Sequence, residues 1–282
     1  MGKKIFKTVG LLLYFIAAQS IGTIGIFMHK IMTDAVWADE LLEALDTDNI
    51  LNTEYISAIS EIIMPALILA DIIIFIPLVI SGIKNYKDEH FINRLQIKDI
   101  IKYLWWGIMF NLFVSTIIEL LPSSLVTGKY NLLMNMAVSG NFFIVLFTTG
   151  ILTPIVEELL FRYGIIKIIR KKETGKQHIN DNKAVIISAL LFGIAHFNII
   201  QSTYAFLLGL IMGKIYVKSE NILTSTYVHI GVNASSVVFD TVPENAQKWL
   251  LFVTAVLTGA YIIQQIISKK ITIAKPVFHD CD

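Results

Sequence analysis

The chain has 282 residues, of which 55% are hydrophobic and 16% are charged. A soluble domain has about 25% charged residues, so this composition excludes an ordinary globular protein and indicates one with most of its mass in a lipid bilayer. The net charge of +1 leaves no basic excess for nucleic acid, and the single cysteine, Cys281, excludes an internal disulfide framework.

Eight apolar segments are predicted to be membrane-spanning helices, because a helix that crosses the hydrocarbon core needs about 20 mainly apolar residues. In chain order they cover residues 8–28, 62–83, 100–121, 140–161, 184–200, 203–217, 222–239 and 249–268. The first is too long for the core of a signal peptide, and we interpret it as a retained anchor. The predicted fold is all-α, a polytopic membrane protein with about eight transmembrane helices.

The distribution of basic residues predicts the orientation, since cytoplasmic loops carry an excess of Lys and Arg. With a cytoplasmic N-terminus, 20 of the 23 Lys and Arg residues fall on the cytoplasmic side. The C-terminus is then cytoplasmic too. The loop 31–60 is extracytoplasmic and carries seven acidic residues and no basic one. We expect an integral, multi-pass protein of a bacterial plasma membrane.

The segment 154–233 contains ionisable side chains at membrane depth. A charged side chain at the bilayer centre costs about 2.5–3.5 kcal/mol, so such a cluster indicates function. Its ionisable members are Glu157, Glu158 and Arg162 in the fourth span, His196 in the fifth and His229 in the seventh. Phe192 and Asn233 lie four residues from the two histidines, on the same helix faces. By contrast Asp71, alone between two prolines of the second span, is interpreted as bonding a freed backbone group or another helix.

These polar side chains are predicted to share one layer of the membrane. The cytoplasmic boundary is set by Arg170, Lys183 and Glu220. Glu157, His196 and Asn233 each lie 13 residues from that boundary along their helices, which is about 20 Å at 1.5 Å per residue. His229 lies about 14 Å from it. Pro154 is the expected position of a kink in the long fourth helix.

The cluster contains the groups that peptide hydrolysis needs. A carboxylate and an imidazole around one water molecule form a general-base pair, and a second imidazole with an amide can stabilise an oxyanion. Glu158 and Arg162 are spaced i,i+4 and are interpreted as a structural ion pair, which leaves Glu157 for chemistry. The reverse assignment of the two glutamates stays open.

Other interpretations of the same residues also stay open. Glu157, His196 and His229 offer the three ligands of a catalytic metal such as zinc, although the chain has no His-Glu-x-x-His motif. The cofactor is therefore either none or a divalent metal. A structural polar network and a transporter or proton relay are further alternatives, but spans one to three hold no counterpart of the cluster, which disfavours a transporter.

Three ordered motifs resemble those of the CAAX prenyl protease and bacteriocin-processing family of intramembrane endopeptidases, also called the Abi family. They are Glu157-Glu158-x-x-x-Arg162, Phe192-x-x-x-His196 and His229-x-x-x-Asn233. The run Gly209-x-x-x-Gly213 is also similar to the family pattern, and such small residues let two helices approach closely. The resemblance covers roughly residues 140–240.

This resemblance implies a helical membrane peptidase whose cavity opens to the cytoplasm. Glu157 and His196 would activate the water, and His229 and Asn233 would stabilise the oxyanion. Glu158, Arg162 and Phe192 would support these groups. The catalytic mechanism of the family has been interpreted both as that of a metalloprotease and as that of a glutamate peptidase.

Family substrates are prenylated or membrane-associated proteins and peptide precursors such as bacteriocins and pheromones. The alternative is a non-catalytic protein of the same fold, for bacteriocin immunity or as a scaffold. We predict three regions, an N-terminal transmembrane region (1–139), a catalytic core (140–240) and a last helix with a cytoplasmic tail (241–282). Membrane lipid and a peptide or protein substrate are the expected partners, and the oligomeric state is not determined by these motifs.

Overall fold

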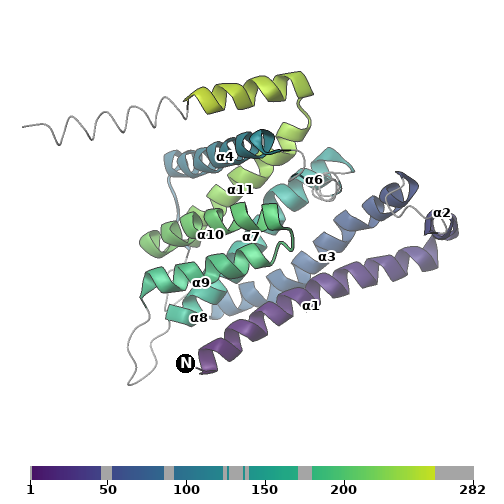
Figure 1. Cartoon of the computed structure of the whole chain (residues 1–282). Coiled ribbons are helices and arrows are strands. Elements are labelled where there is room, and N and C mark those ends of the chain that lie inside the picture. The colour runs from purple at the N-terminus through teal and green to yellow at the C-terminus, as the bar shows by residue number, and fades with distance from the viewer. Residues whose placement is uncertain are drawn as a thin grey trace, which may run out of the picture.

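The computed structural model describes residues 2–45, 53–85, 92–122, 140–170 and 180–257, with the single residues 126 and 136. Every regular element in these ranges is a helix (Figure 1). The elements are α1 (Gly2–Thr33), α2 (Ala35–Leu45), α3 (Thr53–Asn85), α4 (Ile97–Leu120), α6 (Phe142–Phe147), η1 (Thr148–Leu152), α7 (Thr153–Glu158), η2 (Leu159–Ile166), α8 (Lys167–Arg170), α9 (Asp181–Ile194), α10 (Ile199–Ser219) and α11 (Ile222–Asp240). Residues 244–257 are also helical.

Within the described ranges, six helices are long and apolar enough to cross a membrane. They are Lys4–Thr33, Ile59–Ser81, Ile97–Leu120, Phe142–Arg170, Ile199–Ser219 and Ile222–Asp240. Each overlaps one of the predicted spans, and two are clearly longer than predicted: Lys4–Thr33 against 8–28, and Phe142–Arg170 against 140–161. The chain is therefore an all-α, multi-pass integral membrane protein.

The predicted fifth span, 184–200, is wrong in its extent. Helix α9 has 14 residues and ends at Ile194, which gives about 21 Å against about 30 Å of hydrocarbon. The chain turns at 195–198, and the Asn198 side chain caps α10 by accepting hydrogen bonds from the N–H groups of Ile200 and Gln201. This cap interrupts an apolar run that looked continuous in the sequence. Helix α9 and the first part of α10 therefore form a short hairpin.

Two other predictions fall partly outside the described residues. Of the predicted last span, 249–268, the structure describes the helix up to residue 257, and the tail beyond it is not described. The acidic loop 31–60 contains α2 and the start of α3, whereas residues 46–52 are not described.

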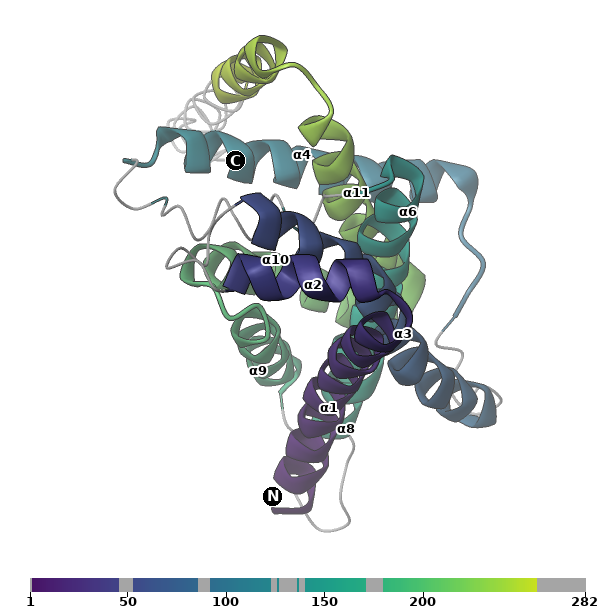
Figure 2. The same cartoon turned by 90° about the vertical axis from the view of Figure 1, so that its right-hand side faces the viewer.

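Several connections meet at one end of the molecule, which we call the basal end. Lys4 Nζ donates to the carbonyl of Ile169 (2.7 Å), so the start of α1 lies beside α8 (Figure 1 and Figure 2). Arg170 forms ion pairs with Asp181 (Nε to Oδ1, 2.8 Å) and Glu220 (NH2 to Oε1, 3.6 Å).

The start of α4 joins the same end. Asn221 immediately precedes α11, and Asn93 lies just before α4. The Nδ2 of Asn221 donates a hydrogen bond to the carbonyl of Asn93 (2.8 Å). Helices α4 and α11 therefore both run away from the basal end, and we call their far ends, at Leu120 and Asp240, the distal end. The segments predicted to be cytoplasmic thus share one end.

The fourth span, in which Pro154 was expected to introduce a kink, is one continuous helix from Phe142 to Arg170. It contains two π-helical segments, η1 and η2, on either side of α7. A proline clashes with the carbonyl four residues earlier in a regular α-helix, and the wider π-turns before Pro154 relieve that clash. The helix is therefore widened on both sides of the two glutamates.

Glycines set the closest helix contacts. A Cβ atom on Gly107 of α4 would lie 2.0 Å from the carbonyl oxygen of Val228, and one on Gly231 of α11 would lie 2.3 Å from that of Leu104. In the α9–α10 hairpin, Cβ atoms on Gly209 and Gly213 would come within 3.0 and 2.8 Å of helix α9. The close approach expected at the Gly-x-x-x-Gly run is confirmed.

Gly107→Ala is expected to lower stability by about 1–3 kcal/mol, because the added methyl group has to push α11 away from α4. The measurement is the midpoint of thermal unfolding in detergent. Gly10→Ala is the matched control, since a Cβ atom at Gly10 meets nothing within 4 Å. Equal melting of the two variants would contradict the tight α4–α11 contact.

Candidate active site

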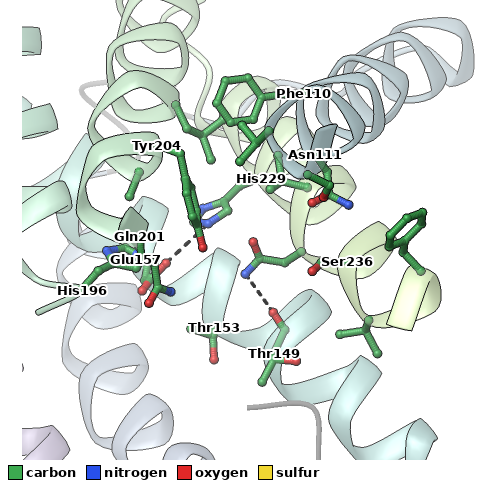
Figure 3. Close-up of a pocket in the computed structure, with 18 of the residues that line it drawn as sticks. Phe110, Asn111, Thr149, Thr153, Glu157, His196, Gln201, Tyr204, His229 and Ser236 are labelled. Atoms are coloured by element: carbon green, nitrogen blue, oxygen red, sulfur yellow. Dashed lines mark hydrogen bonds and ion pairs between the residues drawn. The ribbon is translucent and has the colours of Figure 1, made fainter. Parts of the chain in front are cut away.

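One cavity of about 350 Å³ is lined by Glu157, His196, His229 and Asn233 (Figure 3). Glu157 comes from α7, His196 from the turn after α9, and the other two from one face of α11. Three segments that are far apart in the sequence thus place the four predicted residues around a common space.

His229 lies between the two glutamates. Its Nε2 is 3.5 Å from Glu157 Oε2, and its Nδ1 is 3.2 Å from Glu158 Oε1. Because an ionised carboxylate can only accept a hydrogen bond, the contact with Glu158 assigns a proton to Nδ1. Glu158 therefore fixes the orientation of the imidazole ring that faces Glu157.

The predicted ion pair between Glu158 and Arg162 is present and fully buried. Arg162 Nε donates to Glu158 Oε2 (3.1 Å), and both side chains are 0% exposed. Arg162 NH1 donates to Ser188 Oγ (3.2 Å), whose hydroxyl donates to the carbonyl of Phe161 (2.8 Å). The network joins the fourth span to α9, and through His229 to α11.

The two glutamates differ in their access to the cavity. The Glu157 side chain is 14% exposed and lines the cavity, whereas Glu158 is enclosed and is not part of the lining. This difference favours the assignment of Glu157 to chemistry. Glu158 is more than a partner of Arg162, because it also holds His229.

Phe192 is the apolar centre of the site. Its ring packs edge-on against the imidazoles of His196 (centroids 4.9 Å apart) and His229 (5.5 Å). The Arg162 guanidinium carbon lies 5.0 Å from the centroid of the same ring. Phe192 therefore fixes both imidazoles and covers the buried cation.

His196 directs one ring nitrogen to the backbone. Its Nδ1 lies 2.8 Å from the carbonyl oxygen of Phe192, which can only accept, so Nδ1 carries the proton. In the neutral ring Nε2 then has the lone pair. His196 can accept a hydrogen bond from a water molecule in the cavity.

Asn233 is positioned by the irregularity of the fourth span. Its Nδ2 donates to the carbonyl of Thr149 (3.0 Å), as the dashed line at Thr149 in Figure 3 marks. In π-helical geometry that carbonyl would accept from the N–H of the residue five positions later, which is Pro154 and has none. The proline thus leaves an acceptor for Asn233.

The structure also adds polar residues that the sequence did not single out. They line the cavity from α4, α10 and α11: Asn111, Ser115, Gln201, Tyr204, Ser236 and Asp240. Asn111 is buried, and its Nδ2 has no hydrogen-bond partner among the described residues. These residues are spaced i,i+3 or i,i+4 along their helices (Asn111 with Ser115, Gln201 with Tyr204, Ser236 with Asp240), and this spacing is the signal that could have indicated a common face.

Asp71 bonds another helix, as its isolated position predicted. The carboxylate is buried and accepts a hydrogen bond from Thr153 Oγ1 (2.6 Å). Thr153 begins α7, so this contact ties α3 to the helix that carries Glu157.

The described residues do not fit the three-ligand metal site that was considered for Glu157, His196 and His229. No group of three or more His, Cys, Asp or Glu in the described part of the chain is arranged to hold a metal ion. Both ring nitrogens of His229 contact glutamate oxygens, so neither nitrogen is left for a metal in this arrangement.

These features define a membrane-embedded protein with a Glu-His site in a cavity between helices. Residues 139–235 match the family model described as Rce1-like, type II CAAX prenyl endopeptidase Rce1-like. The chain therefore carries a domain of this CAAX endopeptidase family, and the resemblance predicted from the three motifs is confirmed. Comparisons with curated proteins and with solved structures gave no match.

Arg162→Met is expected to lower the free energy of unfolding by about 3–5 kcal/mol, because it leaves Glu158 buried without its partner. The double variant with Glu158→Gln should lose less than the sum of the two single variants. Unfolding in detergent measures both effects. Lys248→Met is the control, because it breaks an exposed pair with Glu244 and should change stability little. Additive effects of the two buried substitutions would contradict the coupling.

Proposed function

We propose that the chain is an intramembrane endopeptidase that hydrolyses a peptide bond with water activated by Glu157 and His196. The single observation that carries this proposal is the shared cavity of Glu157, His196, His229 and Asn233 within a CAAX endopeptidase domain. The cavity is walled by apolar helices, where each charge and hydrogen bond acts more strongly than in water.

Glu157 is the proposed general base. It takes a proton from a water molecule that His196 Nε2 holds by accepting its other hydrogen, and the water oxygen attacks the carbonyl carbon of the substrate. The carbonyl becomes a tetrahedral oxyanion. Glu157 then gives its proton to the amide nitrogen, the C–N bond breaks, and a carboxylic acid and an amine leave.

His229 and Asn233 are the proposed oxyanion donors. With both ring nitrogens protonated, His229 would donate to Glu158 through Nδ1 and to the oxyanion through Nε2. Asn233 Nδ2 has a second hydrogen beside the one donated to Thr149, and this hydrogen can reach the oxyanion.

The proposed substrate is a membrane-associated or prenylated protein, or the precursor of a peptide such as a bacteriocin or pheromone. The family description supports a prenylated substrate, and a site inside the membrane-spanning region supports a membrane-associated one. The peptide precursors are suggested by the resemblance of the motifs alone. We propose that residues 140–240 are the catalytic core and that the protein acts in a bacterial plasma membrane. A non-catalytic immunity protein or scaffold of the same fold is the second candidate, supported by the resemblance.

Glu157→Gln and His196→Ala are each expected to reduce peptide cleavage about 10²–10⁴-fold while the protein stays folded, because each removes one partner of the general-base pair. Mass spectrometry of products from membranes that carry wild type or variant gives the rate and the cut site. Glu244→Gln is the control, since it changes an exposed carboxylate near the distal end of α11. Full activity of either site variant would rule out the mechanism.

The same samples distinguish the other interpretations. Cleavage should persist after treatment with a chelator. Loss of cleavage would show that the active protein needs a metal, and that its ligands are arranged differently from the side chains described here. A Glu157→Gln variant that protects cells from a bacteriocin as well as wild type would favour the non-catalytic function.

Asn233→Ala is expected to reduce the cleavage rate about 10²–10³-fold, the effect of removing one oxyanion donor. Because Asn233 also satisfies the Thr149 carbonyl, thermal unfolding is measured alongside. Asn221→Ala, which removes the cap of α11 at its basal end, is the control for a purely structural loss. Equal rate losses in the two variants would argue against a role at the oxyanion.

A further inference from the structure

One polar side chain of the cavity, Asn111, has no role in the proposed mechanism. It belongs to α4, outside the residues 139–235 that match the family model, and yet it lines the cavity together with His229 and Asn233. Figure 3 shows it on the α4 side of the space that His229 and Ser236 also face. The N-terminal region of the chain therefore adds a polar group to the site.

The fold leaves the Asn111 carboxamide unsatisfied. The residue is 8% exposed, and its Nδ2 is enclosed and has no hydrogen-bond partner among the described residues. An amide buried in this way costs free energy, whereas a leucine, which has a similar branched shape, has no polar atom to satisfy. The stability of the substrate-free protein therefore does not explain an asparagine at this position. A ligand that pairs with the amide does.

The packing of α4 on α11 sets the level of Asn111 in the cavity. A Cβ atom on Gly107 would lie within 2.8 Å of the α11 backbone at residues 228–232, so the two helices touch there. Both helices run away from the basal end, and Asn111 is four residues beyond Gly107, an advance of about 6 Å. The same advance along α11 leads to residues 232–236. Asn111 is therefore level with Asn233, on the facing wall.

We propose that Asn111 binds the backbone of the substrate peptide next to the bond that is cut. This inference rests on the proposed endopeptidase function, in which His229 and Asn233 hold the oxyanion. A carboxamide and a peptide unit each carry an N–H donor and a carbonyl acceptor, so the two groups can pair by hydrogen bonds. Because Asn111 is level with Asn233 and an extended peptide rises about 3.3 Å per residue, the unit that it meets adjoins the cut bond.

The same pairing discriminates between a peptide and lipid in a cavity that lies within the membrane-spanning region. Acyl chains have no hydrogen-bonding groups, so a lipid tail in the cavity would leave the Asn111 amide unsatisfied. A peptide removes that cost when it binds. Asn111 therefore contributes both to affinity for the substrate and to the exclusion of lipid.

Asn111→Leu tests this role with the substrate that mass spectrometry identifies through Glu157-dependent cleavage. We expect KM to rise about tenfold with little change in kcat, because the hydrogen bond is made before and during the reaction. The midpoint of thermal unfolding in detergent should be at least that of wild type, since the variant removes an unsatisfied buried amide. An unchanged KM would overturn the proposal.

Thr116→Val is the matched control for a structural role. Thr116 is on the same helix and is also 8% exposed, but its hydroxyl donates to the Leu112 carbonyl (2.7 Å) and it is not part of the cavity lining. The expected pattern is the reverse of that for Asn111→Leu, with a lower unfolding midpoint and an unchanged KM. If Asn111→Leu behaved like Thr116→Val, Asn111 would be structural and the proposal wrong.

Substrate analogues test the contact from the other side and do not depend on the folding of a variant. In each analogue an ester replaces one amide bond beside the cut bond, which removes an N–H donor and weakens a carbonyl acceptor. With wild type, the ester at the contacted position should raise KM about tenfold. With Asn111→Leu the same ester should have little further effect, because the contact is already lost. Additive effects at every position would contradict the pairing.

These measurements separate the inference from the function on which it rests. If Glu157→Gln abolishes cleavage and Asn111→Leu keeps the KM of wild type, the endopeptidase function stands and the role of Asn111 is wrong. If no Glu157-dependent product is found, the endopeptidase function is wrong, and the role of Asn111 falls with it.

Discussion

The buried ion pair between Glu158 and Arg162 is the interaction on which the site depends. Two charges removed from water cost several kcal/mol each unless hydrogen bonds and opposite charges surround them. Here Ser188, His229 and the face of Phe192 supply those contacts from two further helices. The arrangement of α9 and α11 around the fourth span is thus specified by electrostatics in a core that is otherwise held by non-directional apolar packing.

The irregular backbone of the fourth span has a similar role on the cavity side. π-helical segments are often found at functional sites because they expose backbone groups that a regular helix would pair. In this chain Pro154 and the segment η1 together leave the Thr149 carbonyl to Asn233. A residue that looks like a simple helix breaker therefore positions an amide on another helix.

The common depth of the polar residues could be predicted from the sequence because the rise per residue is similar in all the helices, although η2 lies between Glu157 and Arg170. Equal spacing from Arg170 and Glu220 placed Glu157 and Asn233 at one depth, and the ion pair between those two boundary residues justifies the common origin. The early end of α9 was not predictable from hydropathy, since the apolar run continues past Ile194. The contribution of α4, through Asn111, depends on which helices pack together. The spacing of Asn111 and Ser115 predicts a shared helix face but not the neighbour that this face meets.

The short α9–α10 hairpin has a consequence for the surrounding lipid. Its turn pairs its own backbone groups locally, with the N–H of His196 donating to the Gly193 carbonyl (3.2 Å) and that of Phe197 to the Ile194 carbonyl (3.2 Å), so it can lie within the hydrocarbon. Ile194, Phe197 and Ile199 are exposed around it. About 9 Å of hydrocarbon beyond the turn then has no hairpin beside it, and acyl chains adapt to such a mismatch by local thinning of the leaflet. For the proposed endopeptidase, a peptide anchored in that leaflet has a shorter distance to travel to Glu157, which makes membrane thickness a determinant of its turnover.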